Sequence, residues 1–264
     1  MTTRKLVAID LDGTLLGADS KISNRSIAIL QEVAKNGHII ILSSGRPPRS
    51  MMETYKALKL TTPLIAYNGA LIKHPLDPSF LGQANTFSKE KIICLFHQIN
   101  NIVTSFVSED ETSIAALHFD AYLDKYFPFT GMETKYGNID HDLSFNPFTC
   151  IMGCDKEIGK KVEVIAEELG YSYRHWRDSA YCELHIPGVG KGSSLRYVQS
   201  LLGFSKEDTI AFGDSDNDFE MLQEAALAFT MKNSRSPLLL SNFPTTEKSN
   251  AEDGVALTLE SILL

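Results

Sequence analysis

The sequence predicts an α/β protein whose parallel-sheet core is interrupted by an inserted α+β region. Short apolar runs alternate with amphipathic helical segments in the first quarter of the chain, and the same alternation returns in the last quarter. The part between them is less regular and contains Pro75, Pro78, Pro128 and Pro147. With 264 residues, the chain is long enough for one large domain or two modest ones.

The first part of the core begins with a short apolar run over residues 6–9, which is typical of a central parallel strand. Ser23 is a good N-cap for the amphipathic helix that follows. Residues 38–42 are mostly β-branched and predict a second buried strand, after which Pro47 is well placed to begin a helix. Residues 64–66 predict a third strand. This alternation indicates parallel βαβ units.

The second part of the core follows the same pattern. Residues 209–212 predict a buried strand. We expect a helix after it, with Phe219, Leu222 and Ala226 on one face. Residues 227–231 then predict another short strand.

The inserted region separates these two parts. We place the core domain at residues 1–83 and 188–264 and the inserted α+β domain at residues 84–187. The insert contains two predicted helices and one predicted strand, over residues 89–100, 156–169 and 180–186.

The composition is that of a soluble globular protein, with 43% hydrophobic and 22% charged residues. A net charge of −8 argues against a nucleic-acid surface, which needs clustered cations. A small phosphorylated substrate stays compatible with this charge, because a few local cations and a metal can reverse the sign of one pocket. No apolar segment of signal length precedes the first strand, and no run approaches the ~18 apolar residues of a membrane helix. We therefore expect a cytoplasmic monomer or homodimer with no membrane or nucleic-acid partner.

The four cysteines do not form a metal-binding pattern. Cys150 and Cys154 are four residues apart, and neither a second close pair nor a nearby set of Cys and His ligands accompanies them. We expect the cysteines to act as small apolar side chains instead.

The most informative stretch is Asp-Leu-Asp-Gly-Thr at residues 10–14, directly after the first strand. Side chains two residues apart on a strand share a face, so Asp10 and Asp12 can point into one crevice. One carboxylate there can attack an electrophile while the other handles protons, and both can offer oxygen to Mg2+. The alternative is a strand that ends in an ordinary polar turn.

Other segments with groups suited to phosphate also end a predicted strand or begin a helix. Ser44 follows the second strand, the acidic cluster at residues 214–218 follows the strand over 209–212, and Lys191 lies at the return from the insert. Ligands of open parallel sheets bind at the carboxyl ends of the strands, where these groups would meet. Taken singly, Ser44 could be a helix cap, Lys191 a solvated turn residue, and the acidic cluster a capping loop. Together the groups predict a hard cation and an anion that bridges to it, and phosphate satisfies both.

On these motifs the chain resembles the haloacid dehalogenase-like (HAD) superfamily, and within it the Cof-type subclass IIB phosphatases. The motifs of the superfamily match, in order, Asp10-x-Asp12-Gly13-Thr14, Ser44, Lys191 and Gly213-Asp-x-x-Asn-Asp218. Subfamily-level matches are residues 67–70 (Tyr-Asn-Gly-Ala), 187–192 (Pro-Gly-Val-Gly-Lys-Gly) and 250–255 (Asn-Ala-Glu-Asp-Gly-Val). The resemblance covers essentially the whole chain. Residues 14–23 are too few to hold a cap domain, so the cap would follow the third strand, as in the C2B type.

The resemblance implies a Rossmann-like core, a mobile cap and Mg2+-dependent hydrolysis of phosphate monoesters. Asp10 is the implied nucleophile, which forms an aspartyl-phosphate, and Asp12 is the implied general acid and base. Asp10, the backbone carbonyl of Asp12 and Asp214 are the implied metal ligands, and Asp218 would support them.

The remaining implied contacts concern the substrate, a small phosphorylated metabolite such as a sugar phosphate or a related monoester. The implied phosphate-binding residues are Ser44, Gly45, Lys191 and Asn217. The expected substrate-side residues are Asn68, Gly69 and Arg46. Candidate cap residues are Arg174, His175, Arg177 and Glu183, for which a solvated charged face is the alternative.

The sequence departs from the usual family pattern at two places, and two functions other than a phosphatase stay open. Residues 43–46 are Ser-Ser-Gly-Arg where Ala-Thr-Gly-Arg is common, which keeps the hydroxyl group. Residues 231–234 are Met-Lys-Asn-Ser where Met-Gly-Asn-Ala is usual, so Lys232 puts the identity of the substrate in question.

A phosphosugar mutase could use the same aspartyl-phosphate, and a non-catalytic phosphometabolite-binding protein could keep the fold. Because a binding protein has no need of a nucleophile, Asp10 disfavours the second of these functions.

Overall fold

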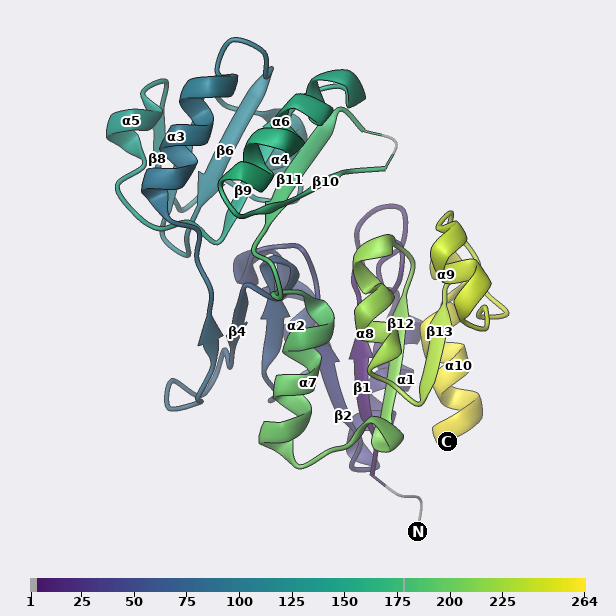
Figure 1. The fold of residues 1–264 in the computed structure, drawn as a ribbon. Coiled ribbons are helices and arrows are strands. Elements are labelled where there is room, and N and C mark those ends of the chain that lie inside the picture. The colour runs from purple at the N-terminus through teal and green to yellow at the C-terminus, as the bar shows by residue number, and fades with distance from the viewer. Residues whose placement is uncertain (1–3, 178) are drawn as a thin grey trace. The chain divides into compact units, whose positions relative to one another are not determined.

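The computed structural model describes residues 4–177 and 179–264. The chain divides into two compact units, shown in Figure 1, which are described separately. The core unit comprises Met1–Gly82 and Gly190–Leu264, and the inserted unit comprises Gln83–Val189. None of the helices in the described part of the chain is both long enough and apolar enough to cross a membrane.

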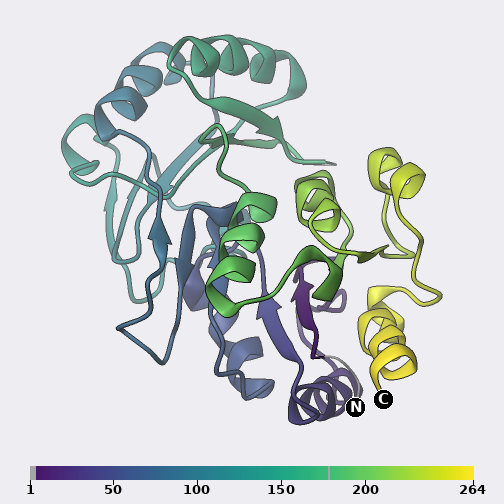
Figure 2. The same ribbon diagram turned by 60° about the horizontal axis from the view of Figure 1, so that its bottom comes forward.

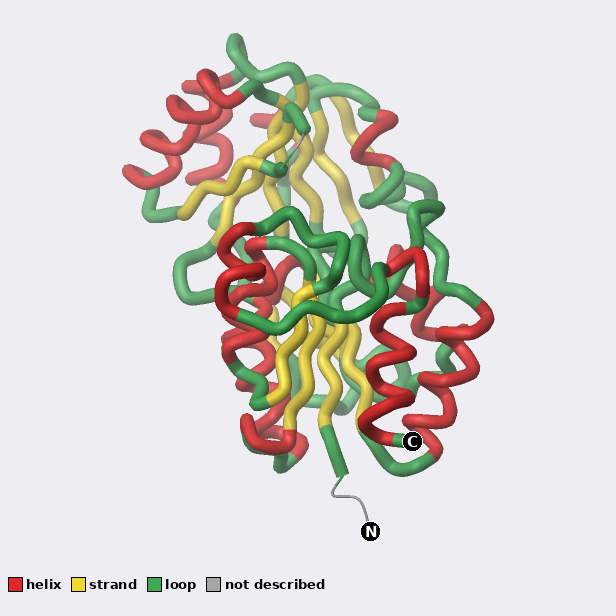
Figure 3. Tube along the Cα trace, turned by 90° about the vertical axis from the view of Figure 1, so that its right-hand side faces the viewer, coloured by secondary structure: helices red, strands yellow, loops and turns green. Residues whose placement is uncertain are grey.

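A four-stranded parallel sheet forms the centre of the core unit. Its strand order is β13 (Leu227–Thr230), β12 (Thr209–Gly213), β1 (Leu6–Ile9) and β2 (Ile39–Leu42). All four residues of β1 are fully buried, because this strand has a neighbour on each side and helices on both faces of the sheet (Figure 3). The prediction of an α/β fold with a parallel-sheet core is confirmed.

Helices follow the strands of this sheet. Their bounds are α1 (Asn24–Lys35), α2 (Pro48–Ala57), α7 (Lys191–Leu202), α8 (Phe219–Gln223), α9 (Pro237–Asn242) and α10 (Gly254–Leu263). The Oγ of Ser23 accepts a hydrogen bond from the N–H of Ser26, so the predicted N-cap of α1 is confirmed. Helix α1 packs against α10 near the two ends of the chain (Figure 2). Pro47 is the N-cap of α2, which begins one residue later than expected.

Two expectations about the core elements are wrong in part. Helix α8 ends at Gln223, and Ala226 lies outside it and is exposed. The chain must already turn there, since the N–H of Ala226 bonds to the carbonyl of Lys206 one residue before β13 begins. Ile65 of strand β3 (Leu64–Ala66) forms an isolated parallel bridge with Ser43, the residue after β2, and the main partner of β3 is the antiparallel strand β4 (Leu71–Lys73). A sharp turn over Tyr67–Gly69 reverses the chain between these two strands.

The inserted unit is built on a six-stranded sheet. The strands, in spatial order, are β10 (Ser172–His175), β11 (Tyr181–His185), β9 (Thr149–Gly153), β6 (Ser105–Glu109), β7 (Ser113–Ala116) and β8 (Glu133–Tyr136). Strands β7 and β8 pair in parallel, and the other pairs are antiparallel. The remaining elements are β5 (Gln83–Ala84), α3 (Lys89–Ile99), α4 (Ala121–Asp124), α5 (Ile139–Asp142) and α6 (Lys156–Glu168). The two long helices and the last strand lie where the sequence predicts them.

An apolar cluster joins this sheet to its helices. Ile92 of α3 and Val162 of α6 pack in the same cluster as Phe106 of β6. Cys150, Cys154 and Cys182 belong to the cluster and are buried, so these three cysteines act as apolar side chains, as predicted.

Candidate active site

Asp10 is the first residue after the central strand β1, and its side chain is almost fully buried. Its backbone N–H continues the sheet by bonding to the carbonyl of Phe212 at 3.1 Å. Its Oδ1 accepts a hydrogen bond from the Nζ of Lys191 at 2.6 Å. The end of the strand therefore fixes the backbone of Asp10, and Lys191 fixes its carboxylate.

Lys191 begins helix α7 and is 2% exposed. Its Nζ bonds to Oδ1 of Asp10 and to Oδ1 of Asp218, each at 2.6 Å. Burial alone would lower the pKa of this ammonium group, but the two carboxylates raise it above its ordinary value. Lys191 is therefore a buried cation, and its alternative interpretation as a solvated turn residue is wrong.

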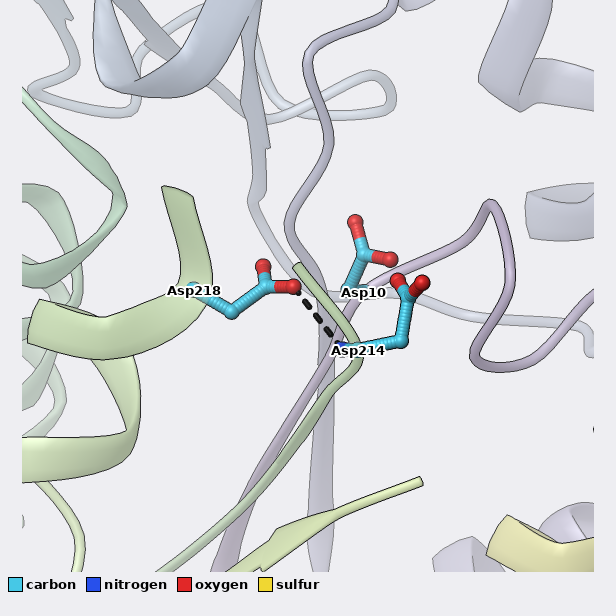
Figure 4. Close-up of side chains that lie close together, drawn as sticks. All are labelled: Asp10, Asp214 and Asp218. Carbon is cyan, nitrogen blue, oxygen red and sulfur yellow. Dashed lines mark hydrogen bonds between the residues drawn. The ribbon is translucent and has the colours of Figure 1, made fainter. Parts of the chain in front are cut away.

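Asp10, Asp214 and Asp218 form one acidic cluster (Figure 4). Each offers a carboxylate oxygen, and these three oxygens lie within 4.8 Å of one another. Burial and then the charge of Asp218 raise the pKa of Asp214 to about 7. The pKa of Asp10 is also raised, first by burial and then by the charge of Asp218. Buried carboxylates that repel one another favour a bound cation, and an all-oxygen set suits a hard one such as Mg2+.

Both carboxylate oxygens of Asp218 accept hydrogen bonds from other groups of the protein. Its Oδ2 accepts the backbone N–H groups of Asp214 at 3.0 Å and Ser215 at 3.1 Å, and its Oδ1 accepts Lys191. The capping interpretation of the acidic loop is thus correct for this one carboxylate, which also pairs with the buried lysine. Because both of its oxygens have protein partners, Asp218 is better suited to support a metal site than to be a principal ligand.

The turn after β1 brings this acidic cluster together with the first motif. Gly13 has a φ of +76°, and a Cβ at that position would lie 2.5 Å from Oδ2 of Asp214. A glycine is therefore required both by the backbone conformation and by the close approach of the carboxylate. Thr14 donates from Oγ1 to Oδ1 of Asp214 at 3.4 Å, a contact that the sequence did not single out.

Asp12 lies apart from this acidic cluster and pairs with Arg46. The Nε of Arg46 donates to Oδ2 of Asp12 at 2.7 Å, and its Nη2 donates to Oδ1 at 2.5 Å. The guanidinium group is buried, whereas the Asp12 side chain is 41% exposed. A two-pronged pair of this kind fixes the plane of the carboxylate. Sequence reasoning selected both residues but placed Arg46 on the substrate side and did not predict their pairing.

Ser44 lies two residues after the end of β2 and is buried. Its Oγ accepts the N–H of Arg46 at 3.2 Å, and its own N–H bonds to the carbonyl of Ile65. Helix α2 begins only after Pro47, without a side-chain cap, so the alternative of Ser44 as a helix cap is wrong. The carbonyl of Ser44 accepts the N–H of Asn68, which places Asn68 beside this loop.

Asn68 connects this loop to the acidic motif. Its Oδ1 accepts a hydrogen bond from Nδ2 of Asn217 at 2.9 Å. A Cβ on Gly45 would lie 3.0 Å from Nδ2 of Asn68, so the amide packs directly on that glycine. Gly69, the next residue, approaches the carbonyl of Gly190, next to Lys191. The structure thus brings every site residue predicted in the core unit into one connected region.

Three residues that sequence reasoning did not assign to the site support its loops through backbone carbonyls. Asn233 donates to the carbonyl of Gly13 at 2.7 Å, and Ser234 donates to the carbonyl of Asp214 at 2.6 Å. Asn250 donates to the carbonyl of Leu16 at 2.7 Å. Two features of the sequence pointed to these residues: the subfamily match at residues 250–255, which contains Asn250, and the departure at residues 231–234, which contains Asn233 and Ser234. Lys232 itself is exposed, and its backbone N–H bonds to Oγ1 of Thr246.

The candidate cap residues lie in the inserted unit: Arg174 and His175 are on β10, Glu183 is on β11, and Arg177 lies in the turn that follows β10. Glu183 is 3% exposed and pairs with Arg174 and His185. Burial would raise the pKa of Glu183, but Arg174 and then His185 hold it below its ordinary value. Arg174 pairs with this buried carboxylate and is only partly exposed, so it does not belong to a fully solvated face.

A parallel sheet that carries an acidic cluster and a buried lysine at its strand ends defines the class of the haloacid dehalogenase-like hydrolases. The chain belongs to this family, whose model matches residues 7–259.

Curated relatives of known activity are similar over nearly their whole length. The chain is 30% identical to the 5-amino-6-(5-phospho-D-ribitylamino)uracil phosphatase YitU of Bacillus subtilis (strain 168), over 97% of this chain and 96% of that protein. It is 26% identical to the HMP-PP phosphatase of Shigella boydii serotype 4, over 89% of this chain and 90% of that protein.

Solved structures share the fold. A haloacid dehalogenase-like hydrolase from Bacteroides thetaiotaomicron superposes with a TM-score of 0.83 at 25% identity, covering 98% of this chain and 100% of that one. A HAD subclass IIB sugar phosphatase superposes with a TM-score of 0.80 at 18% identity, covering 97% and 98%. The prediction of a Cof-type phosphoric monoester hydrolase is confirmed by these comparisons taken together.

Proposed function

We propose that the chain hydrolyses small phosphorylated metabolites in a Mg2+-dependent reaction that passes through an aspartyl-phosphate on Asp10. One observation carries this proposal: the buried carboxylate of Asp10 bonds to Lys191 and lies in one cluster with Asp214. A nucleophile, a cation for phosphoryl oxygens and a metal ligand thus lie together. A protein that only binds phosphate would need the last two and not the first.

In the first half of the reaction, a carboxylate oxygen of Asp10 forms a bond to phosphorus while the bond from phosphorus to the leaving oxygen breaks. Asp12 gives its proton to that oxygen, and the alcohol leaves. In the second half, Asp12 takes a proton from water, whose oxygen attacks phosphorus and releases Asp10 and inorganic phosphate. Arg46 holds the plane of the Asp12 carboxylate through both of its oxygens.

The residues present fit Mg2+. Asp10, Asp214 and the backbone carbonyl of Asp12 would hold it, and Asp218 would support them through its bonds to the loop and to Lys191. When bound, Mg2+ offsets the charge that these carboxylates and the phosphoryl group share. Phosphoryl transfer depends largely on positioning and on such charge neutralisation.

The phosphoryl group would be held by residues from three loops of the core unit. They are Ser44 and Gly45 after β2, Lys191 at the start of α7, and Asn217 in the acidic loop. Asn68 and Gly69 would lie beside them on the substrate side.

We assign the inserted unit the role of a cap that contacts the leaving group and excludes water. The relatives act on a phosphoribityl-aminouracil, on HMP-PP and on sugar phosphates, according to their names. This supports a phosphate monoester of a small polar metabolite as the substrate class. The exposed Lys232, where glycine is usual, would modify the choice within that class.

The test is acid-quenched labelling with a radioactive phosphoryl donor, in wild type, Asp10→Asn and Asp12→Asn, with and without Mg2+. We expect trapped label in Asp12→Asn with an aryl phosphate, because a good leaving group needs little protonation and hydrolysis then lacks its base. The loss of turnover in this variant should be about 10²- to 10⁴-fold. Label on Asp10→Asn at the wild-type level would refute Asp10 as the nucleophile, and full turnover of metal-stripped protein would refute the metal requirement. Asp216→Asn, an exposed position in the same loop, is the matched control.

A further inference from the structure

The turn between β3 and β4 has an unusual backbone. Tyr67, Asn68 and Gly69 have φ values of +50°, +53° and +100°, three left-handed residues in succession. Such a conformation is costly for residues other than glycine and persists where surrounding contacts hold it. Asparagine tolerates it better than most residues, whereas a tyrosine does not. All three residues are buried.

Contacts with two phosphate-binding segments hold this turn. The N–H of Tyr67 bonds to the carbonyl of Arg46 at 3.1 Å, and the N–H of Asn68 bonds to the carbonyl of Ser44 at 3.0 Å. On the other side, the Oγ of Ser194 in α7 donates to the carbonyl of Gly69 at 3.0 Å. A Cβ on Gly69 would lie 2.4 Å from the carbonyl oxygen of Gly190, so only glycine allows this approach.

The side chain of Asn68 adds a link to the third segment. It is 7% exposed, and its Oδ1 accepts Nδ2 of Asn217 at 2.9 Å. Asn217 directly precedes Asp218, whose carboxylate bonds to Lys191. The strained turn therefore touches the loop of Ser44, the start of α7 and the acidic loop at once.

An amide NH2 group has two N–H bonds, and Asn68 accepts one of them. That bond directs one N–H of Asn217 toward Asn68, which restricts the orientation of the amide and of its second N–H. The Asn68 side chain thus bonds to the acidic loop and packs on Gly45 of the Ser44 loop, while the backbone of the turn makes the other contacts.

We propose that Asn68 is a positioning residue for phosphate, acting through Asn217, and that the left-handed turn exists to place its side chain there. The inference rests on the proposed function in that Asn217 is taken as a phosphoryl ligand. Asn68 itself then need not touch the substrate, which differs from the substrate-side role expected from the sequence.

The test is a double-mutant cycle with Asn68→Gly, Asn217→Ala and the double variant. Glycine removes the amide and suits the left-handed backbone, so the turn keeps its conformation. We measure kcat/KM with p-nitrophenyl phosphate and, by calorimetry in the presence of Mg2+, the affinity for orthovanadate as a phosphate mimic. Each single variant should lose about 10- to 100-fold in both quantities, as expected for a hydrogen bond to a charged group, and the double variant should lose no more than Asn217→Ala alone.

Lys59→Gly is the matched control, since Lys59 is exposed and has a φ of +54° but lies outside the site. It should keep wild-type values. If Asn68→Gly does not fold, Asn68→Ser replaces it in the cycle, and the double variant should again lose no more than Asn217→Ala alone.

Losses that multiply in the double variant would overturn the proposal, as would Asn68→Gly within twofold of wild type. The orthovanadate measurement needs no turnover, so it tests the Asn68–Asn217 pair even if the chain hydrolyses no monoester. An inactive wild-type protein with a non-additive orthovanadate cycle would therefore refute the proposed function and leave the positioning role supported.

Discussion

Replacing Asp214 with asparagine should stabilise the metal-free protein while removing its response to Mg2+. Asp214 lies in a buried cluster with Asp10 and Asp218, and its pKa is raised to about 7 by burial and by the charge of Asp218. A carboxyl group whose pKa is raised on folding stabilises the protein below its unfolded pKa, and that stability is lost as the pH rises through its folded pKa. Wild-type protein without metal should therefore lose stability between about pH 4 and pH 7.

The magnitude follows from the same pKa. It exceeds the ordinary aspartate value of 3.8 by about 3 pH units. Since each unit corresponds to about 1.4 kcal/mol, ionising Asp214 costs the folded metal-free protein up to about 4 kcal/mol at pH 8. Asparagine cannot ionise, and its one amide oxygen can still accept from Thr14 or from Ser215, which donate to different oxygens of Asp214. The variant should thus be more stable than wild type at pH 8 by up to this amount, and the two should converge near pH 4.

The assay is guanidinium denaturation of chelator-treated protein at pH 4.5 and pH 8, followed by circular dichroism, with and without millimolar Mg2+. Added Mg2+ should raise the denaturation midpoint of wild type at pH 8 and leave that of Asp214→Asn unchanged. The difference in stability between the two proteins should therefore become smaller or change sign. Asp216→Asn, exposed in the same loop, should follow wild type throughout. An Asp214→Asn variant that is less stable than metal-free wild type at pH 8 would refute the reasoning, because repulsion would then not dominate the cluster.

Three further substitutions test other contacts of the site. Arg46→Gln should lower kcat/KM by about 10-fold or more for alkyl phosphates and less for aryl phosphates, because Arg46 acts through Asp12 and good leaving groups need little protonation; equal losses on both substrates in steady-state assays would contradict this. Lys191→Met should destabilise the protein by about 3–5 kcal/mol in metal-free denaturation at pH 8, because it leaves two buried carboxylates without their cation; unchanged stability would count against a buried ion pair. Gly13→Ala should abolish stabilisation by Mg2+ in thermal unfolding, since its Cβ would lie 2.5 Å from Asp214; a wild-type Mg2+ response would show that the turn can yield.

The parts of the site that follow from strand ends were predictable from the sequence. Asp10 and the acidic loop follow neighbouring parallel strands, and the pairing of Ile9 with Phe212 brings the carboxyl ends of those strands together. Lys191 was predictable from its place at the return from the insert, where it is the first residue of α7. Apolar runs specify buried parallel strands, and the carboxyl ends of such strands converge whatever the side chains are.

Contacts that depend on side-chain conformation were not predictable. The pairing of Asp12 with Arg46 joins residues 34 positions apart and depends on the rotamers of both. The bonds of Asn233 and Ser234 go to backbone carbonyls, which carry no sequence signal of their own. The left-handed backbone of Tyr67 also opposes local preference and exists only because tertiary contacts hold it.

The charges of the acidic cluster favour a divalent cation as the metal of the proposed reaction. Asp12 pairs with Arg46 and is not one of the three clustered carboxylates, although its charge still adds to the raised pKa of Asp214. The cluster of Asp10, Asp214 and Asp218 contains three carboxylates and one ammonium group, Lys191, which leaves two negative charges when all are ionised. Two positive charges balance that excess, and a monovalent ion at the same place would leave one charge buried and unpaired, which is costly. Millimolar Mg2+ should therefore stabilise the protein at pH 8, where Asp214 is ionised, far more than the same concentration of Na+ or K+.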